Sequence, residues 1–595
     1  MYKYSILYCT FFSYNALMNI KTINQAPLFI AIGLVFIGMV FRLYNFPVYS
    51  FLFDQVQIYE NSQHILQGDL TLIGPRTGPA EMFTGPLIYY LNALSLLITN
   101  SPFSLVITAN IISLTTGISL IFLTRRYLHS DYHILIPLLW ATSPMLINLD
   151  RVAWNPNISL LATSLSFFPL LKTKKLNLVD ILIVSIGAFL GYQAHFGGLF
   201  LAPLIILGLL ITRRFNPLPM ISVVAATIFS LVPTVVFDLK NDWLNLRGLL
   251  ALTSNSVEVN RRISVLDILK MIKFHLENLG LIVFANNHSS LIITAGITFL
   301  ILFLLSRKIT QAKILVCTWI IAIITVFSLY RRPIPEYYLL ILYPAFIYII
   351  ASVIQPLWNL SLKVSLPKVK TKEILFNKIL VLGLITLAGL STVLNFSKKR
   401  VESMATALEV QAKVNSLSSS QPVKSIVYDT EDIYTIGWRY LLQDIKTDQK
   451  GFDYHLVFPY TTGHLITQKI EPDLAIWVDE RTDQSKSYLS QPDHIIEYPK
   501  DLAIYEDLNN KPYNSRYSYL IFNSSNQPIA RLFMIPEEQY VPEFTELEID
   551  TQTSIWKAVL IENKTWYYYK NQKTTYLLEP LEDNFDITTI NILTN

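Results

Sequence analysis

The sequence predicts an α-helical polytopic membrane protein that ends in a water-soluble mixed α/β domain. Of its 595 residues, 52% are hydrophobic and only 15% are charged, and the mean hydropathy is +0.40. Soluble domains carry about 25% charged residues, so this deficit is typical of a membrane protein. Apolar runs recur from about residue 27 to 397 and then stop. We therefore expect an N-terminal cytoplasmic segment at 1–26, a transmembrane domain at 27–399 and an extracytoplasmic soluble domain at 400–595.

The composition also excludes several classes of function. The net charge of +4 is too small to indicate a nucleic-acid partner. The two cysteines, Cys9 and Cys317, rule out a disulfide framework and a cysteine-based metal site. The chain has no Gly-rich phosphate loop, HExxH or Walker sequence, which argues against a nucleotide-driven pump. The segment 1–26 is either a weak signal-like region or an early start ahead of Met18.

Eleven apolar segments are candidates for membrane spans, since a helix needs roughly 20 apolar residues to cross a bilayer, with some latitude for tilt. They are 27–44, 103–124, 134–149, 157–171, 178–194, 197–212, 217–237, 288–306, 314–330, 338–356 and 379–396. Clusters of lysine and arginine follow the second, fourth, sixth, eighth and tenth of these segments. Basic residues favour the cytoplasmic side of short loops, so the pattern predicts an N-terminus inside and a C-terminal domain outside.

The first outer segment, 45–102, contains two apolar stretches that the pattern assigns to helices lying on the membrane. Residues 54–67 place Val56, Tyr59, Ile65 and Leu66 near one helical face. The run 85–98 is too short to span comfortably and is predicted to be an interfacial or re-entrant helix. In the soluble domain, helices are expected at 400–416 and 431–443. Stretches rich in β-branched and aromatic residues predict strands at 425–429, 455–460, 474–480, 517–523, 530–535 and 565–570.

Ionisable and aromatic side chains gather in the segments predicted to lie on the outer face. Charges near a membrane are costly and usually functional, and these residues share one depth, so they can converge on a cavity open to the outside. The candidates for substrate binding are Arg76, Asp150, Arg151, Trp154, Asn155, His195, Arg331, Arg332 and Tyr337.

Asp54 is the candidate catalytic residue. It follows Phe51, Leu52 and Phe53, whose side chains should shield the carboxylate from water and raise its pKa. Such a carboxylate can take the proton from a hydroxyl group as that group attacks, an effect worth roughly 10²–10⁴-fold in rate.

Three features together resemble the polytopic glycosyltransferases of the GT-C fold, and most nearly glycosyltransferase family 39. They are Asp54 shortly after the first span, the ending GPLIYYL of the first outer loop, and the sequence R-x-x-W-N-P at 151–156. The family includes protein O-mannosyltransferases and bacterial aminoarabinose transferases. The resemblance covers about residues 27 to 400. The chain departs from the family pattern at Asp54-Gln55, where the family has an acidic pair, and at Asn155 or Pro156, where members carry another acid.

The resemblance implies a hexosyl- or pentosyltransferase of the cytoplasmic membrane. It would take a sugar from a polyprenyl-phosphate carrier and pass it, with inversion, to a protein or a lipid or glycan acceptor on the outer face. Outer-face arginines would hold the carrier phosphate, because arginine makes bidentate contacts with phosphate. A divalent cation, Mg²⁺ or Mn²⁺, is compatible with such a site but is not required. The soluble domain would cover the cavity or help to select the acceptor.

Each candidate residue also has a simpler interpretation. Asp54 suits the N-cap of the helix at 54–67. Asp150 and Arg151 could form an ion pair at the membrane surface, and Trp154 could belong to the aromatic belt. His195 could be a solvated residue at the end of a span.

Three alternative functions remain open on the sequence. A transporter or flippase for a lipid-linked sugar would favour broken helices and mid-membrane charges, but the middles of the predicted spans are nearly free of charge. A ligase-type GT-C enzyme that uses a diphosphate carrier would need a large outer loop, which 238–287 could supply. An inert scaffold would use only the soluble domain, to bind a partner.

Overall fold

The computed structural model divides into two compact units, Met1–Lys399 and Arg400–Asn595. It describes residues 26–77, 82–172, 175–212, 217–253, 265–284, 289–305, 309–329, 335–359, 376–394, 403–429, 432–457, 468–471, 474–479, 486–491, 494–499, 501–506, 517–523, 527–536, 545–546, 557–561, 564–570, 574–581 and 590–594. The segment 1–25, with Met18 and Cys9, lies outside these ranges.

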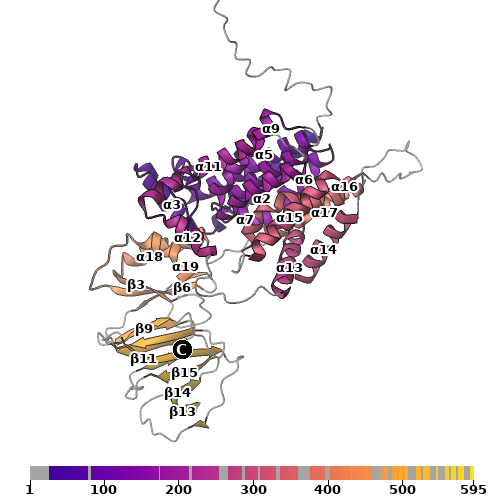
Figure 1. Cartoon of the computed structure of the whole chain (residues 1–595). Helices are drawn as coiled ribbons and strands as arrows, with labels where there is room; N and C mark the ends of the chain where they lie inside the picture. The colour runs from indigo at the N-terminus through magenta and orange to yellow at the C-terminus, as the bar shows by residue number, and fades with distance from the viewer. Residues whose placement is uncertain are drawn as a thin grey trace, which may run out of the picture. The chain divides into compact units, whose positions relative to one another are not determined.

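The first unit is helical, and its helices run from indigo to pink in Figure 1. The α-helices are α2 (Ala26–Leu43), α3 (Phe53–Leu66), α4 (Leu87–Leu96), α5 (Phe103–Tyr127), α6 (Tyr132–Thr142), α7 (Pro144–Asp150), α8 (Asn157–Phe167), α9 (Leu178–Ala194), α10 (Leu201–Ile211), α11 (Pro217–Lys240), α12 (Leu244–Thr253), α13 (Val265–Leu281), α14 (Ser289–Leu305), α15 (Gln311–Leu329), α16 (Tyr343–Trp358) and α17 (Phe376–Leu394). Four 3₁₀ helices accompany them: η1 (Phe46–Val48), η2 (Phe168–Leu171), η3 (Phe196–Phe200) and η4 (Glu336–Ile341).

Every predicted span overlaps a described helix, but the count of eleven spans is confirmed only in part. By length and composition, two described helices can cross a membrane by themselves, α5 and α11. The pair α6 and α7 meets the same criterion together and bends by 57° where the two helices join. Pro144 explains the bend, because proline opens α7 and has no N–H to continue α6. Further apolar helical stretches within the described ranges, such as Pro27–Leu43 in α2 and Gln311–Phe327 in α15, have 10 to 17 residues.

The helices share one large apolar core, and close packing of α2 against α6 shows how it is built. Trp140 of α6 is fully buried. A Cβ at Gly38 of α2 would lie 2.9 Å from the Cζ3 atom of Trp140 and 2.9 Å from the Cα of Ala141. Only glycine fits at that distance, and such small residues let membrane helices approach closely. The charged Arg42 lies one turn further along α2 and is also buried.

The first outer segment contains the two predicted surface helices and a hairpin that was not predicted. Helix α3 matches the predicted 54–67, and α4 matches the predicted 85–98. They pack against each other, and the Ser62 hydroxyl donates to the carbonyl of Tyr89 at 2.9 Å. Between them, β1 (Arg76–Thr77) pairs antiparallel with β2 (Met82–Phe83). Ile65 and Leu66, which the pattern placed on the apolar face of α3, are not among its buried residues.

The second unit is a mixed α/β domain, drawn from orange to yellow in Figure 1. It begins with α18 (Met404–Ser418) and contains α19 (Asp432–Leu442). Its strands are β3 (Val423–Asp429), β4 (Phe452–Val457), β5 (Gln468–Glu471), β6 (Leu474–Asp479), β7 (Lys486–Gln491), β8 (His494–Pro499), β9 (Ala503–Glu506), β10 (Tyr517–Phe522), β11 (Pro528–Pro536), β12 (Thr545–Glu546), β13 (Lys557–Ile561), β14 (Lys564–Lys570), β15 (Thr574–Pro580) and β16 (Asn591–Thr594).

These strands form three sheets with different connections. The strand orders are β3-β4-β6-β5, β16-β8-β7 and β12-β13-β14-β15-β11-β10-β9. The strands β3 and β4 are parallel and are joined through α19, whereas the seven-stranded sheet is antiparallel throughout. Both predicted helices and all six predicted strands of this domain are present, and the remaining strands were not predicted.

Candidate active site

A cavity of about 460 Å³ in the first unit brings together six of the predicted site residues. Five separate segments line it: the start of α3, the hairpin of β1 and β2, the loop between α7 and α8, the end of α9 and the start of η4. The lining residues are Phe53, Asp54, Pro75, Arg76, Thr77, Thr84, Trp154, Asn155, Pro156, His195, Tyr337 and Tyr338.

Asp54 lies at the cavity, and α3 begins two residues earlier than an N-cap aspartate would require. The N-cap is Leu52, so Asp54 lies in the first turn of the helix, and the N-cap interpretation of this residue is wrong. The Oε1 atom of Gln55 accepts a hydrogen bond from the Leu52 N–H at 3.0 Å and satisfies one of the free donors of the helix start. Gln55 is buried. The side-chain amide of Gln55, which stands where the family 39 pattern has a second acid, therefore has a hydrogen-bond partner in the structure.

The surroundings of Asp54 explain its electrostatics. Burial raises the pKa of this carboxyl above its ordinary value of 3.8. Of the three residues expected to shield it, Phe51 is buried, but Phe53 is 52% exposed and itself lines the cavity. Burial and the nearby Asp54 carboxylate raise the pKa of the Tyr89 phenol, which places that tyrosine of α4 within electrostatic range. Tyr89 was not among the predicted site residues.

Arg76 is held at the cavity by a hairpin that is fixed at several points. The backbone N–H of Phe83 donates to Asn245 Oδ1 of α12 at 2.6 Å, and the carbonyl of Phe83 accepts from the Tyr192 hydroxyl of α9 at 3.1 Å. Asp238, at the end of α11, accepts hydrogen bonds from the side chain and the backbone N–H of Asn245 at 2.8 and 2.9 Å. Arg76 is the only lysine or arginine among the described residues that line the cavity.

His195 contributes a neutral imidazole. Its Nδ1 atom accepts a hydrogen bond from the Gly197 N–H at 3.0 Å, so the proton of the neutral ring is on Nε2. Burial lowers the pKa of His195 to about 4, and the ring therefore stays uncharged at neutral pH. The residue is 9% exposed and lines the cavity, which excludes the interpretation as a solvated residue at the end of a span. It offers a hydrogen-bond donor without a positive charge.

An aromatic wall adjoins His195. The ring of Tyr337 lies 4.4 Å from that of Trp154, edge to face, and 5.0 Å from that of Tyr338. The His195 ring is 4.4 Å from Tyr338. The residue before the tryptophan, Ala153, has a left-handed backbone with φ of 56°, a strained conformation for alanine that directs the chain into this wall.

Asn155 and its neighbours fix the position of this loop. Its Nδ2 atom donates to the carbonyl of Ala194 at 2.7 Å and so joins the loop to the end of α9. The backbone N–H of Trp154 donates to Asn157 Oδ1 at 2.8 Å. The apolar faces of sugar rings pack well on aromatic rings, and the wall has the residue types for such a contact.

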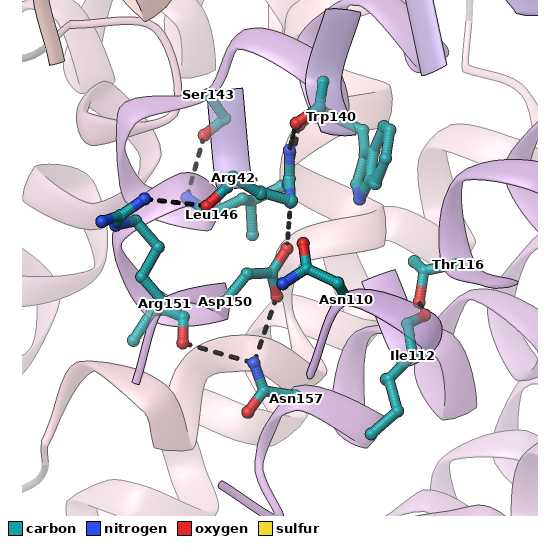
Figure 2. A network of polar contacts seen from close by, with 12 residues as sticks. Arg42, Asn110, Ile112, Thr116, Trp140, Ser143, Leu146, Asp150, Arg151 and Asn157 are labelled. Carbon is teal, nitrogen blue, oxygen red and sulfur yellow. Dashed lines mark hydrogen bonds and ion pairs between the residues drawn. The ribbon is translucent and has the colours of Figure 1, made fainter. Parts of the chain in front are cut away.

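Asp150 and Arg151 do not line the cavity, in contrast to the expectation for substrate-binding residues. Both are buried, with 7% and 4% of their surface exposed. The ion-pair partner of Asp150 is Arg42, with 2.5 Å between Nε and Oδ2, instead of the neighbouring Arg151. Figure 2 shows Asp150 between Arg42 and Asn157, and Arg151 reaching back toward Arg42. The physical reason is that a buried arginine in a membrane helix needs a carboxylate partner.

Two predicted residues, Arg331 and Arg332, lie outside the described residues. Their roles stay predictions. Within the described ranges, no group of three or more His, Cys, Asp and Glu side chains could hold a metal ion. Thr77 and Thr84 line the cavity although the sequence pattern gave no signal for them, because isolated threonines in a loop have no distinguishing spacing.

Comparisons with known proteins find solved structures of similar fold but no matching sequence family. No family model and no curated protein matches the chain. A crystal structure of ArnT from Cupriavidus metallidurans bound to undecaprenyl phosphate is similar, with 10% identity over 77% of this chain and 98% of that chain and a TM-score of 0.48. The apo structure of the same protein gives 11% identity, 76% and 98% coverage and a TM-score of 0.49. An apo oligosaccharyltransferase from Archaeoglobus fulgidus gives 10% identity, 72% and 65% coverage and a TM-score of 0.43. Family 39 itself is not confirmed.

Proposed function

We propose that this protein is a membrane glycosyltransferase that moves a sugar from a polyprenyl-phosphate carrier to an acceptor on the outer face. One observation carries the proposal. A single cavity places a partly buried carboxylate, an arginine, a neutral imidazole and an aromatic wall together, although they come from segments far apart in the sequence. These are the groups that transfer from a phosphate carrier needs: a base, a cation for the leaving group, and a surface for the sugar.

Asp54 is the base in this proposal. The acceptor hydroxyl oxygen attacks the anomeric carbon of the donor, and its proton passes to the Asp54 carboxylate. The bond between that carbon and the phosphate oxygen breaks, and its electron pair remains on the phosphate. Attack opposite the leaving group inverts the anomeric configuration. Burial raises the pKa of Asp54 and so strengthens it as a base, and roughly 10²–10⁴-fold in rate is the usual contribution of such a group.

Arg76 stabilises the leaving phosphate, and His195 supports it or the sugar. The phosphate gains negative charge as the bond breaks, and a guanidinium beside it offsets that charge. The Nε2–H of His195 donates a hydrogen bond to an oxygen of the polyprenyl-phosphate sugar. Trp154 and Tyr337 present ring surfaces to the sugar.

The test uses the purified full-length chain in lipid nanodiscs with a panel of polyprenyl-phosphate sugars and one polyprenyl-diphosphate glycan. Mass spectrometry follows loss of the donor and release of the carrier. We expect one or more monophosphate donors to be consumed, and Asp54→Asn to slow that reaction by roughly 10²–10⁴-fold. The variant should remain folded with an unchanged or higher Tm at pH 7, because the carboxylate it replaces is costly to ionise where it is buried.

Other outcomes identify the alternatives. Consumption of the diphosphate donor alone would favour a ligase-type enzyme. Movement of an intact donor between leaflets without release of the carrier would favour a transporter. Full activity in Asp54→Asn would show that the base assignment is wrong.

A further inference from the structure

We propose that Arg151 is a positioning residue that holds the turn leading to Asp54 and ties it to the loop that carries Trp154; this inference rests on the proposed function. The sequence indicated a substrate-binding arginine. The contacts of its side chain are instead with the backbone at the end of α2, nine to twelve residues before the base.

The guanidinium of Arg151 caps the C-terminal end of α2 from another part of the chain. Its Nη1 atom donates to the carbonyl of Arg42 at 2.8 Å and to that of Tyr44 at 2.5 Å, and its Nη2 donates to the carbonyl of Asn45 at 3.0 Å. The last carbonyls of a helix have no partner within the helix, and a cation is favourable beside them. Asn45 has a left-handed backbone with φ of 48°, so the chain turns sharply at this point.

Tyr49 fixes the next part of the same turn. The Arg151 guanidinium lies 4.8 Å from the centre of its ring. The Tyr49 hydroxyl donates to the carbonyl of Arg42 at 3.0 Å and accepts from Asn110 Nδ2 of α5 at 2.9 Å. Tyr49 is fully buried. The segment between α2 and α3 is therefore held at its start and again at Tyr49, five residues before Asp54, which limits where α3 can start.

The same hydrogen-bond network continues to the loop that carries Trp154. Asp150 binds Arg42 Nε at 2.5 Å and accepts from Asn157 Nδ2 at 3.5 Å. Asn157 in turn accepts from the backbone N–H of Trp154. Adjacent residues thus bind the side chain and the main chain of Arg42, as Figure 2 shows. Displacement of Arg151 would therefore disturb both the start of α3, which carries the base, and the loop that carries Trp154.

The test compares Arg151→Lys with the wild-type chain in donor turnover. A lysine has all its donors on one nitrogen and lacks the planar two-nitrogen fork that reaches the three carbonyls beside Tyr49, so α3 should lose its fixed start. Misplacement of a reacting group by about 1 Å can cost roughly 10²-fold in rate, and we expect kcat to fall toward that extent. The KM for the donor should change much less than kcat, because Arg151 itself does not contact the donor. A residue that binds the carrier phosphate would instead raise KM.

A second variant and a control keep the test informative. Tyr49→Phe removes only the hydroxyl and keeps the ring, so the chain should fold, and kcat should fall with KM unchanged. Arg126→Lys is the control: this arginine pairs with Asp180 at 2.8 Å at the start of α9, far in sequence from both outer loops, and neither kcat nor KM should change.

A readout that does not depend on catalysis separates this inference from the proposed function. Asp54→Cys in a chain with Cys9→Ser and Cys317→Ser carries a single thiol at the cavity. Adding Arg151→Lys should speed its reaction with a soluble maleimide, and adding Arg126→Lys should not. An unchanged labelling rate, or a raised donor KM with unchanged kcat, would overturn the positioning role. Absence of turnover by the wild-type chain, with faster labelling in Arg151→Lys, would reject the proposed function alone.

Discussion

Asp54 combines two features that usually oppose each other in a carboxylate. It lies in the first turn of α3, where the helix dipole favours a negative charge, yet burial raises its pKa. Burial thus makes the ionised form of Asp54 less favourable than in water, while the start of the helix favours it. A base with these properties accepts a proton more readily than an exposed aspartate.

The pKa of Asp54 predicts the pH dependence of the reaction. Only the ionised carboxylate can accept a proton, so kcat/KM should fall as the pH falls through this pKa. Because burial raises the pKa, the fall should begin at a higher pH than for an aspartate with the ordinary value of 3.8. Initial rates of donor consumption between pH 4 and 8 measure this fall in kcat/KM, which is the acidic limb of the pH profile. A rate that stays flat down to pH 4 would contradict the assignment.

His195 allows a control on the origin of that limb. Its pKa is lowered to about 4, so its ring does not gain a proton over most of the same range. The acidic limb should therefore persist at the same pH in His195→Gln. Disappearance of the limb in this variant would move the titration from Asp54 to His195.

A pair of substitutions separates the two nitrogen atoms of His195. Asn keeps an acceptor near Nδ1, which receives the Gly197 N–H, but lacks the donor at Nε2. Gln keeps a donor near Nε2 but loses that acceptor. We expect His195→Asn to keep its Tm and to lose about tenfold or more in kcat/KM, which corresponds to about 1.4 kcal/mol for a hydrogen bond to a charged group. His195→Gln should keep more activity and lose stability by about 1 kcal/mol. The reverse order would show that Nε2 has no substrate role.

At the scale of single residues, the sequence predicted half of the residues that line the cavity but not the buried ion pair. Asp54, Arg76 and His195 were predicted from their polar character in outer segments, and they do line one cavity. Asp150 has the same character but faces inward, because it neutralises Arg42. A signal for that pairing was present: Arg42 is a charge within the first predicted span, and such a charge requires a partner at the same depth.

The hairpin of β1 and β2 is an element of the cavity that the sequence did not predict. Its strands have two residues each, which is too short for an alternating pattern. Its position depends on distant partners: Phe83 of β2 binds Asn245 and Tyr192, and the start of α4 just after the hairpin binds Gln193. The Oε1 atom of Gln193 in α9 accepts from the Leu87 N–H at 3.2 Å, and its Nε2 donates to the carbonyl of Ser230 in α11 at 2.9 Å. No local pattern contains this information, whereas the long apolar helices were readily predicted from hydropathy.

Gly85 tests how far the hairpin controls the site. A Cβ at this position would overlap the side-chain amide of Gln193, so Gly85→Ala should displace the amide that anchors the start of α4. Overpacking of this kind costs roughly 1–3 kcal/mol, measurable as a lower Tm. Because Arg76 belongs to the same hairpin, the KM for the donor should rise more than kcat falls.

A second glycine of the same chain serves as the control for this substitution. A Cβ at Gly33 of α2 meets nothing within 4 Å, so Gly33→Ala should leave Tm and KM close to the wild-type values. Equal effects from the two substitutions would show that the hairpin anchor has no special role.

The membrane topology belongs to the whole molecule, and it decides whether the cavity faces the outer surface. The predicted spans and basic clusters place the turn after α3 outside, the turn after α5 inside and the start of the second unit outside. The last placement requires an even number of crossings between α3 and that unit. Several apolar helices, α4 among them, are shorter than a full span, so the number of crossings depends on which of these helices cross the membrane.

Labelling of single cysteines in intact cells measures these three positions. In a chain with Cys9→Ser and Cys317→Ser, we would introduce Asp69→Cys after α3, Ser130→Cys after α5 and Ser420→Cys after α18, all at exposed residues. An impermeant maleimide should label positions 69 and 420 in intact cells and position 130 only after the membrane is opened. Labelling of 130 without opening would invert the topology and place Asp54 inside, where the proposed acceptors are absent. Labelling of 69 but not 420 would mean that the number of crossings is odd and that α4, or one of the shorter apolar helices, has been assigned to the wrong class.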